Sequence, residues 1–217
     1  MIDESPKRVP VLDPVDRVSE IIFGVLMALT FTGTLSVATA GREQVRTMML
    51  TALGCNIAWG LTDGVMYLVR TYTERHRKVR LLNRLRTIEE KSAAYELIAE
   101  ALPPLIAANA PVEVFDTLHR RLLICPVPGT RLVAGDYYAA LGIFILVVSA
   151  TFPVVLPFIF ITKTALALRL SNLLAVCTLF VCGCALGHHT TEKAWPYGLA
   201  MTAIGSALVG IIVALGG

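Results

Sequence analysis

Charged residues are scarce in this sequence. They make up 16% of its 217 residues, whereas a soluble domain carries about one-quarter. Hydrophobic residues fill 55% of the chain, which excludes a disordered protein as well as a water-soluble globular one. The composition therefore predicts a small membrane protein that crosses the bilayer several times.

The sequence also lacks the patterns that mark several other classes of protein. Its five cysteines do not have the spacing of a disulfide framework, and its glycines do not follow the three-residue period of collagen. It contains no Gly-x-Ser-x-Gly, Gly-x-x-x-x-Gly-Lys or His-Glu-x-x-His motif. We therefore expect neither an enzyme nor a permanently bound cofactor.

Five apolar runs are each long enough to cross the hydrocarbon core as a helix, which takes about 20 residues. Within them only Asp63 and Arg169 are charged. Membrane-spanning β-strands would be shorter and would alternate in polarity. The expected fold is an all-α membrane protein with five transmembrane helices, at residues 21–40, 48–69, 138–161, 166–187 and 195–217.

The distribution of Lys and Arg predicts the orientation of these helices. Most of the basic residues lie between the second and third runs, so that side should be cytoplasmic. The N-terminus is then cytoplasmic as well, and Gly217 lies outside. The first run has no small-residue cleavage site, so we expect it to remain in the mature protein. A bacterial inner membrane and an organellar membrane both fit this integral, multi-pass arrangement.

The predicted domain order is a cytoplasmic segment at 1–20, two membrane helices within 21–70, a cytoplasmic helical insert at 71–134 and three membrane helices within 135–217. Leucines recur at helical spacing in the insert, and prolines interrupt it. The insert is too small for much core. Its arginines are expected to contact anionic lipid headgroups, because the interleaved aromatic residues of a nucleic-acid-binding surface are missing.

Three stretches of sequence carry a resemblance to a known family. They are FGVLMALTFTGTLS from Phe23, LGCNIAWGLTDGVMYL from Leu53 and ALGIFILVVSATFPVVLPFIF from Ala140. Together with the order of two membrane helices, a helical insert and three more helices, they resemble the vacuolar iron transporter family of divalent-metal carriers. The resemblance implies a homodimer that moves Fe²⁺ or Mn²⁺ out of the cytoplasm, with coupling to protons left open.

Other residues occupy the positions of this family's metal ligands. The first-helix aspartate and the second-helix methionine of the family fall on Met27 and Trp59. The resemblance thus implies a relocated site, in which Met27 offers a thioether and Asp63 supplies the carboxylate. Glutamates gather metal on the family's insert, a role that falls here to Glu96 and Glu100, one helical turn apart.

Asp63 also stands out on physical grounds. A carboxylate at the bilayer centre costs about 2.5–3.5 kcal/mol to insert, so such groups usually face a polar interior or an ion pathway. Asn56 lies seven positions earlier, on the same helical face. One interpretation is an ion pathway along Asp63, Asn56 and Met27, with Glu20 nearer the interface. The other is a structural hydrogen bond from Asp63 to a neighbouring helix, with Glu20 solvated.

Two further groups of metal-ligating side chains each have two interpretations. Cys177 and Cys184 share one face of a helix, where they either bind a soft metal or pack as small apolar residues. His188, His189 and Glu192 follow on the same segment and either hold a divalent ion or lie in solvent.

Glycines and prolines predict how the membrane helices pack. Gly60 and Gly64, and a second pair that begins at Gly183, lie four positions apart and let helices approach closely within a bundle or a dimer interface. Pro153 and Pro157 are expected to kink the third membrane helix, because proline removes a backbone donor.

Two hypotheses of different classes follow. In the first, the chain transports a divalent cation, with Asp63 as the central ligand or proton carrier. In the second, it has kept the fold but lost transport, and it serves as a membrane-anchored interaction or regulatory protein that presents the insert.

Overall fold

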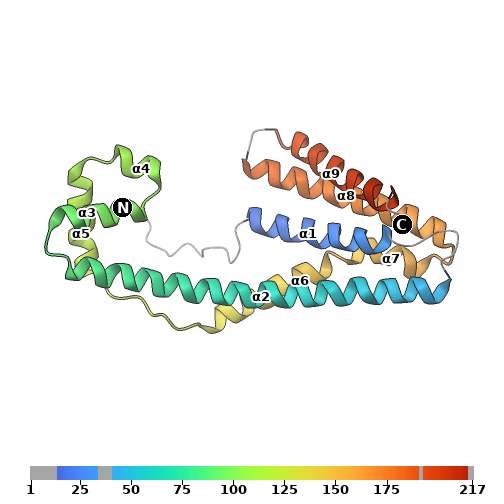
Figure 1. Cartoon of the computed structure of the whole chain (residues 1–217), viewed down its shortest axis with the longest axis horizontal. Helices are drawn as coiled ribbons and strands as arrows, with labels where there is room; N and C mark the ends of the chain where they lie inside the picture. Colours follow the sequence, from blue (N-terminus) through green and yellow to red (C-terminus); the bar gives the residue numbers. More distant parts are fainter. Residues whose placement is uncertain (1–13, 34–40, 191–192, 215–217) are drawn as a thin grey trace, which may run out of the picture. The chain divides into compact units, whose positions relative to one another are not determined.

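The computed structural model describes residues 14–33, 41–190 and 193–214, and all regular structure in these ranges is helical (Figure 1). The prediction of an all-α chain is confirmed. In the described part of the chain the helices are α1 (Pro14–Gly33), α2 (Arg42–Thr87), α3 (Lys91–Ala101), α4 (Pro104–Asn109), α5 (Val112–Ile124), α6 (Ala134–Ser149), α7 (Phe152–Phe160), α8 (Thr164–Thr190) and α9 (Trp195–Ala214).

The chain divides into two compact units. We call Tyr67–Ala134 the insert unit, and Met1–Met66 together with Gly135–Gly217 the bundle unit. The long helix α2 contributes its first part to the bundle unit and the remainder to the insert unit. The insert that the sequence predicts at 71–134 falls within the insert unit.

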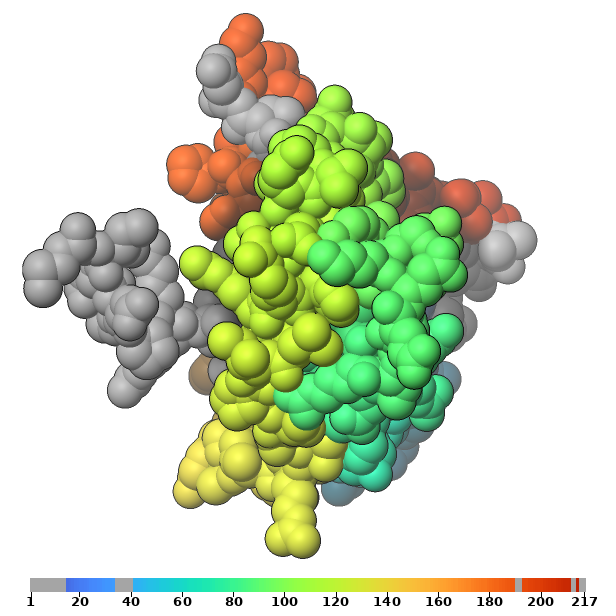
Figure 2. Space-filling model, turned by 90° about the vertical axis from the view of Figure 1, so that its left-hand side faces the viewer, coloured from blue at the N-terminus to red at the C-terminus, as the bar shows by residue number. Residues whose placement is uncertain are grey.

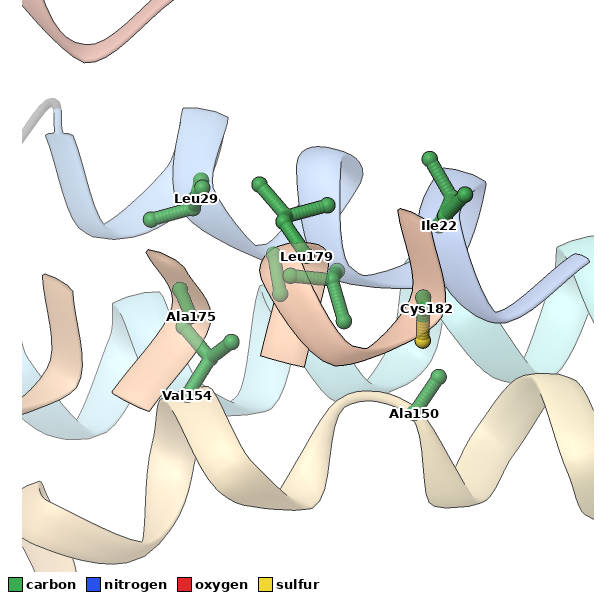
Figure 3. Close-up of a cluster of buried hydrophobic side chains, with 9 residues drawn as sticks. Ile22, Leu29, Ala150, Val154, Ala175, Leu179 and Cys182 are labelled. Atoms are coloured by element: carbon green, nitrogen blue, oxygen red, sulfur yellow. The ribbon is translucent and has the colours of Figure 1, made fainter. Parts of the chain in front are cut away.

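Helix α8 is the centre of the bundle unit, where it packs against α1, α7 and α9. Figure 3 shows the main apolar cluster, in which Ile22 and Leu29 of α1 lie close to Leu179 of α8. Ala150 and Val154, from the end of α6 and from α7, complete this cluster. The helices come close together because small side chains alternate with branched ones at the contact.

Glycines bring α8 and α9 into backbone contact. A Cβ atom on Gly183 would lie 2.6 Å from the carbonyl oxygen of Tyr197, and one on Gly187 would lie 2.8 Å from that of Ala194. No larger residue fits at either position without moving the backbone. The predicted role of these glycines in helix packing is confirmed.

The third predicted membrane helix is broken into α6 and α7, whose axes differ by 46°. Pro153 lies in the first turn of α7 and has no N–H group to donate to the carbonyl one turn earlier. The chain therefore leaves the helical path between Ser149 and Phe152. The predicted kink is confirmed at Pro153, whereas Pro157 is accommodated inside α7.

One helix in the described ranges is long and apolar enough to cross a membrane, namely Thr164–His189 within α8. The bent pair α6 and α7 makes a second candidate if the two helices form one span, and the apolar helix at Trp195–Ile211 is shorter. Asn56 and Asp63 lower the hydropathy of α2, and residues 34–40 of the first predicted run lie outside the described residues. Length and hydropathy therefore do not establish five spans.

The insert unit has a core of its own. Leu85 of α2 packs with Leu97 and Ile98 of α3 and with Phe115 of α5. In Figure 2 the lime residues of α4 and α5 lie beside the green residues of α2 and α3. Although the insert's length suggested little core, this cluster gives the unit a buried centre.

A polar network at the edge of this core joins α3 to α5. The Asp116 carboxylate accepts a hydrogen bond from the Tyr95 hydroxyl at 2.9 Å and from Lys91 Nζ at 3.4 Å, and it pairs with Arg120 at 2.7 Å. The Tyr95 hydrogen bond, with help from Lys91 and Arg120, holds the pKa of Asp116 below its ordinary value of 3.8, although partial burial opposes the shift. The ionised carboxylate thus stabilises the folded insert unit.

Replacing Asp116 with Asn should remove a pH-dependent part of this unit's stability. Because the pKa of Asp116 is lower in the folded state, its contribution is present above about pH 4 and is lost as the pH falls through that lowered pKa. Hydrogen-exchange mass spectrometry of the full chain should show weaker protection of α3 and α5 in Asp116→Asn than in the native protein at pH 6. The difference should shrink towards pH 3.

Glu96→Gln is the matched control, since Glu96 is exposed in the interior of α3. It should leave protection unchanged at every pH. A difference between native protein and Asp116→Asn that stays constant from pH 6 to pH 3 would show that the charge of Asp116 does not stabilise the unit.

Candidate polar site in the bundle unit

The side chain of Asn56 is the most buried polar group on α2, with 0% of its surface exposed. Its Nδ2 atom donates to the Thr151 hydroxyl, at the break between α6 and α7, and to the Gly24 carbonyl of α1 at 3.4 Å. Its Oδ1 atom is buried and has no hydrogen-bond partner. One amide therefore holds three segments together and still leaves an acceptor vacant.

Glycines bring the helices close enough for this contact. A Cβ atom on Gly24 would lie 2.9 Å from the Cβ of Ala150, so only glycine lets α1 approach the end of α6 there. On α2, Cβ atoms at Gly60 and Gly64 would each lie 3.1 Å from a carbonyl oxygen of α6. Asn56, Gly60 and Gly64 recur every four residues and form the face of α2 that meets α6.

A pair of sulfur atoms lies beside the Asn56 amide. The Cys55 thiol of α2 is 3.3 Å from the Met27 thioether of α1, and both side chains are half-buried. Cys55 directly precedes Asn56, and Met27 lies one turn beyond Gly24. The Asn56–Gly24 hydrogen bond thus joins the same two helices, α2 and α1, that bring the sulfurs together.

Asp63 lies two turns further along α2, about 10.5 Å from Asn56 at 1.5 Å per residue. The residue is half-buried, and its Oδ2 atom is buried without a hydrogen-bond partner. The structural interpretation of Asp63 required this carboxylate to accept a hydrogen bond from a neighbouring helix, and Oδ2 accepts none. A buried carboxylate oxygen that no donor satisfies is an available ligand for a cation.

The remaining predicted site residues lie on α1 and α3. Glu20 is half-buried on α1, and Glu96 and Glu100 are exposed on α3, in the insert unit. Trp59, at the position of the family's methionine, is 41% exposed on α2. The structure therefore places Met27 of α1 beside the part of α2 that carries Asn56, with Asp63 two turns further along α2, whereas Glu96 and Glu100 belong to the insert unit.

The other candidate ligands do not form a cluster either. Cys177 is exposed and Cys184 is half-buried on α8. The rings of His188 and His189 lie 5.8 Å apart, both exposed, whereas Glu192 lies outside the described residues. In the ranges that the structure describes, no three His, Cys, Asp or Glu side chains come together as a metal site.

Sequence reasoning missed two residues of the site and one buried carboxylate on α6. Thr151 lies within an apolar run, and the one sequence feature that distinguishes it is its position two residues before Pro153, where a helix break is expected. Cys55 was overlooked because the three cysteines of α8 stand closer together in the sequence. Asp136, 7% exposed at the start of α6, lay just outside the predicted run.

The site thus offers a thioether, a thiol, an amide oxygen and a carboxylate oxygen from α1 and α2. Neither a protein-family model nor a curated protein matches this chain. The function of the chain is therefore inferred from these groups and from the surface of the bundle unit.

The Asn56–Thr151 contact predicts a measurable coupling between two distant positions. Asn56→Ala and Thr151→Ala should each destabilise the bundle unit, and the double variant should lose less than the sum. We expect a coupling free energy of about 0.6 kcal/mol, the average for hydrogen bonds between membrane helices, and at most about 1.7 kcal/mol. Reversible unfolding in detergent mixtures provides the measurement.

Thr62→Ala is the control partner for Asn56→Ala, because the Thr62 hydroxyl bonds to Ala58 of its own helix at 2.9 Å. That pair of changes should be additive. Additivity of Asn56→Ala with Thr151→Ala as well would mean that the contact contributes nothing to stability.

Proposed function

We propose that the chain is a multi-pass membrane protein that carries a divalent cation, Fe²⁺ or Mn²⁺, out of the cytoplasm. The observation that carries the proposal is the buried Oδ2 atom of Asp63, which has no hydrogen-bond partner. Leaving a carboxylate in such a place is costly unless it binds a cation or a proton during the working cycle. Because one carboxylate binds either species, exchange of the cation for protons is consistent with a single central group.

The surface of the bundle unit supports a membrane location. Large apolar side chains point outward from several of its helices, and each of those named here is at least 50% exposed. They are Leu50, Leu61 and Val65 of α2, Leu141 and Ile145 of α6, Leu173 and Val181 of α8, and Leu199, Ile204 and Ile211 of α9. Water-soluble monomers rarely expose apolar patches of more than a few hundred Å². Lipid is the solvent that suits this surface.

In the proposed topology α1, α2, the bent pair α6 and α7, α8 and α9 make five crossings. Helix α2 is included despite Asn56 and Asp63, since intramembrane polar residues facing a bundle interior are typical of transport proteins. The N-terminus and the insert unit then lie in the cytoplasm, where exposed arginines such as Arg77, Arg80 and Arg84 meet anionic lipid. Glu96 and Glu100, exposed one turn apart on α3, are suited to collect cations there.

This topology makes a labelling prediction. In a chain without its native cysteines, single cysteines are placed at four exposed positions, Glu43, Asn83, Lys163 and His189. A membrane-impermeant maleimide added to intact cells should label positions 43 and 163, and it should reach 83 and 189 only after permeabilisation. Labelling of 43 and 83 from the same side would show that α2 does not cross the membrane.

The transport proposal predicts that flux depends on Asp63. Purified protein in liposomes should move Fe²⁺ and Mn²⁺ faster than empty liposomes do, and the rate should respond to an imposed pH gradient if protons are exchanged. Asp63→Asn keeps the shape of the side chain but removes its charge, so flux should fall to the level of empty liposomes. Asp63→Glu should retain part of the flux.

Thr62→Val is the matched control, because the neighbouring Thr62 side chain is exposed and bonds within its own helix. It should transport like the native chain. If folded native protein shows no flux above empty liposomes, or if Asp63→Asn transports normally, then the transport proposal is wrong.

The second candidate function is a membrane-anchored interaction or regulatory protein. The observation that favours it is the insert unit, which has its own buried core and a separate polar network around Asp116. A folded chain without flux, whose insert unit binds a cytoplasmic partner after Asp63→Asn as well as before it, would support this candidate. In both cases the resemblance to a dimeric family makes a homodimer the expected assembly.

A further inference from the structure

We propose that Met27 and Cys55 form a two-ligand site for a soft monovalent cation, Cu⁺ or Ag⁺. The proposal does not depend on transport of divalent cations and concerns binding alone. Its basis is the 3.3 Å contact between Met27 Sδ and Cys55 Sγ, which come from two different helices of the bundle unit. Thioether and thiolate sulfur are the ligands that select such soft ions.

The surrounding structure holds the two sulfur atoms in register. The Asn56 side chain, adjacent to Cys55, donates to the carbonyl of Gly24, which lies one turn before Met27. This hydrogen bond and the close approach of Gly24 to Ala150 fix α1 against its neighbours. The pairing of Met27 with Cys55 is therefore set by the helix contact and not by the flexibility of the methionine.

Charge balance selects a monovalent ion. When the ion binds, the thiol loses its proton to water and the new bond is formed between sulfur and metal, so one positive charge enters and one leaves. The thiolate, the neutral thioether and the monovalent ion then sum to zero charge. A divalent ion would leave a net positive charge in a low-dielectric bundle, which is costly.

The number of available ligands also favours a soft monovalent ion. Mn²⁺ and Fe²⁺ favour oxygen and nitrogen ligands in larger sets, whereas Cu⁺ and Ag⁺ accept two sulfur atoms. In the described part of the chain no larger set of His, Cys, Asp or Glu gathers. The sulfurs, 3.3 Å apart, have to move apart to admit an ion between them, because even a zinc–sulfur bond is about 2.3 Å long. Met27 permits this through its three rotatable side-chain bonds.

Calorimetric titration with Ag⁺ in chloride-free buffer tests the proposal on the full chain in detergent. The other four cysteines also bind Ag⁺, so the chain is first prepared with alanine at Cys125, Cys177, Cys182 and Cys184, and its thermal unfolding is compared with that of the native protein. This Cys55-only chain should bind one Ag⁺. Cys55→Ser should abolish binding, and X-ray absorption of the bound Ag⁺ should show sulfur neighbours.

The decisive variant is Met27→Leu, which conserves side-chain volume but removes the thioether. It should weaken Ag⁺ binding by at least about tenfold. Substitutions of residues that only support the ligands of a metal site already cost about this much affinity. Met66→Leu, at an exposed methionine of the same helix as Cys55, should leave the affinity unchanged. Each variant is checked for unaltered thermal unfolding without metal.

Equal affinity of Met27→Leu and the Cys55-only chain would overturn the proposal, because the thiol alone would then account for binding. Displacement of Ag⁺ by excess Mn²⁺ would overturn it too. These outcomes can be told apart from failure of the proposed transport. Transport is measured as Fe²⁺ and Mn²⁺ flux into liposomes and its dependence on Asp63, and its failure would not change Ag⁺ binding by the chain in detergent.

Discussion

The hydrogen bonds of the Asn56 amide join α2 to α1 and to the break between α6 and α7. In a bundle whose outer surface is apolar, such a bond has no water to compete with, and each unsatisfied polar atom is costly. The Thr151 hydroxyl beside the break at Pro153 accepts a hydrogen bond from another helix, which stabilises the broken segment within the bundle. The contact between Met27 and Cys55 and the unpartnered Oδ1 atom of Asn56 both depend on how this amide joins the helices.

The bundle unit and the insert unit solve different packing problems. In the bundle unit glycines allow backbones to touch, as between Gly183 and the Tyr197 carbonyl, while large apolar side chains face outward. In the insert unit Leu85, Leu97 and Phe115 are buried and most of the arginines are exposed, a pattern typical of domains that fold in water. The two units therefore differ in the side chains that they expose, and the change from one unit to the other falls within α2.

Part of this organisation could be predicted from particular residues. Pro153 indicated a kink because the missing N–H is a property of the residue itself, and the Gly183 pair indicated close helix packing because a missing Cβ matters wherever two helices meet. Asn56 and Asp63 could be selected because polar residues are rare in apolar runs. Thr151 and Cys55 could not, since threonine and cysteine are common in membrane helices and become important only through a partner on another helix.

The sequence by itself determined that the chain is all-α, that apolar helices flank an arginine-rich helical insert, and that Asn56 and Asp63 share one helical face. These follow from composition and local periodicity, which act within a few residues along the chain. Only the tertiary structure decided that Asn56 bonds to Gly24 and Thr151, that Met27 meets Cys55, and that Asp63 keeps a buried oxygen without a donor. These depend on the register and rotation of one helix against another, and helix contacts formed largely by glycine and apolar side chains leave little trace of that register in the sequence.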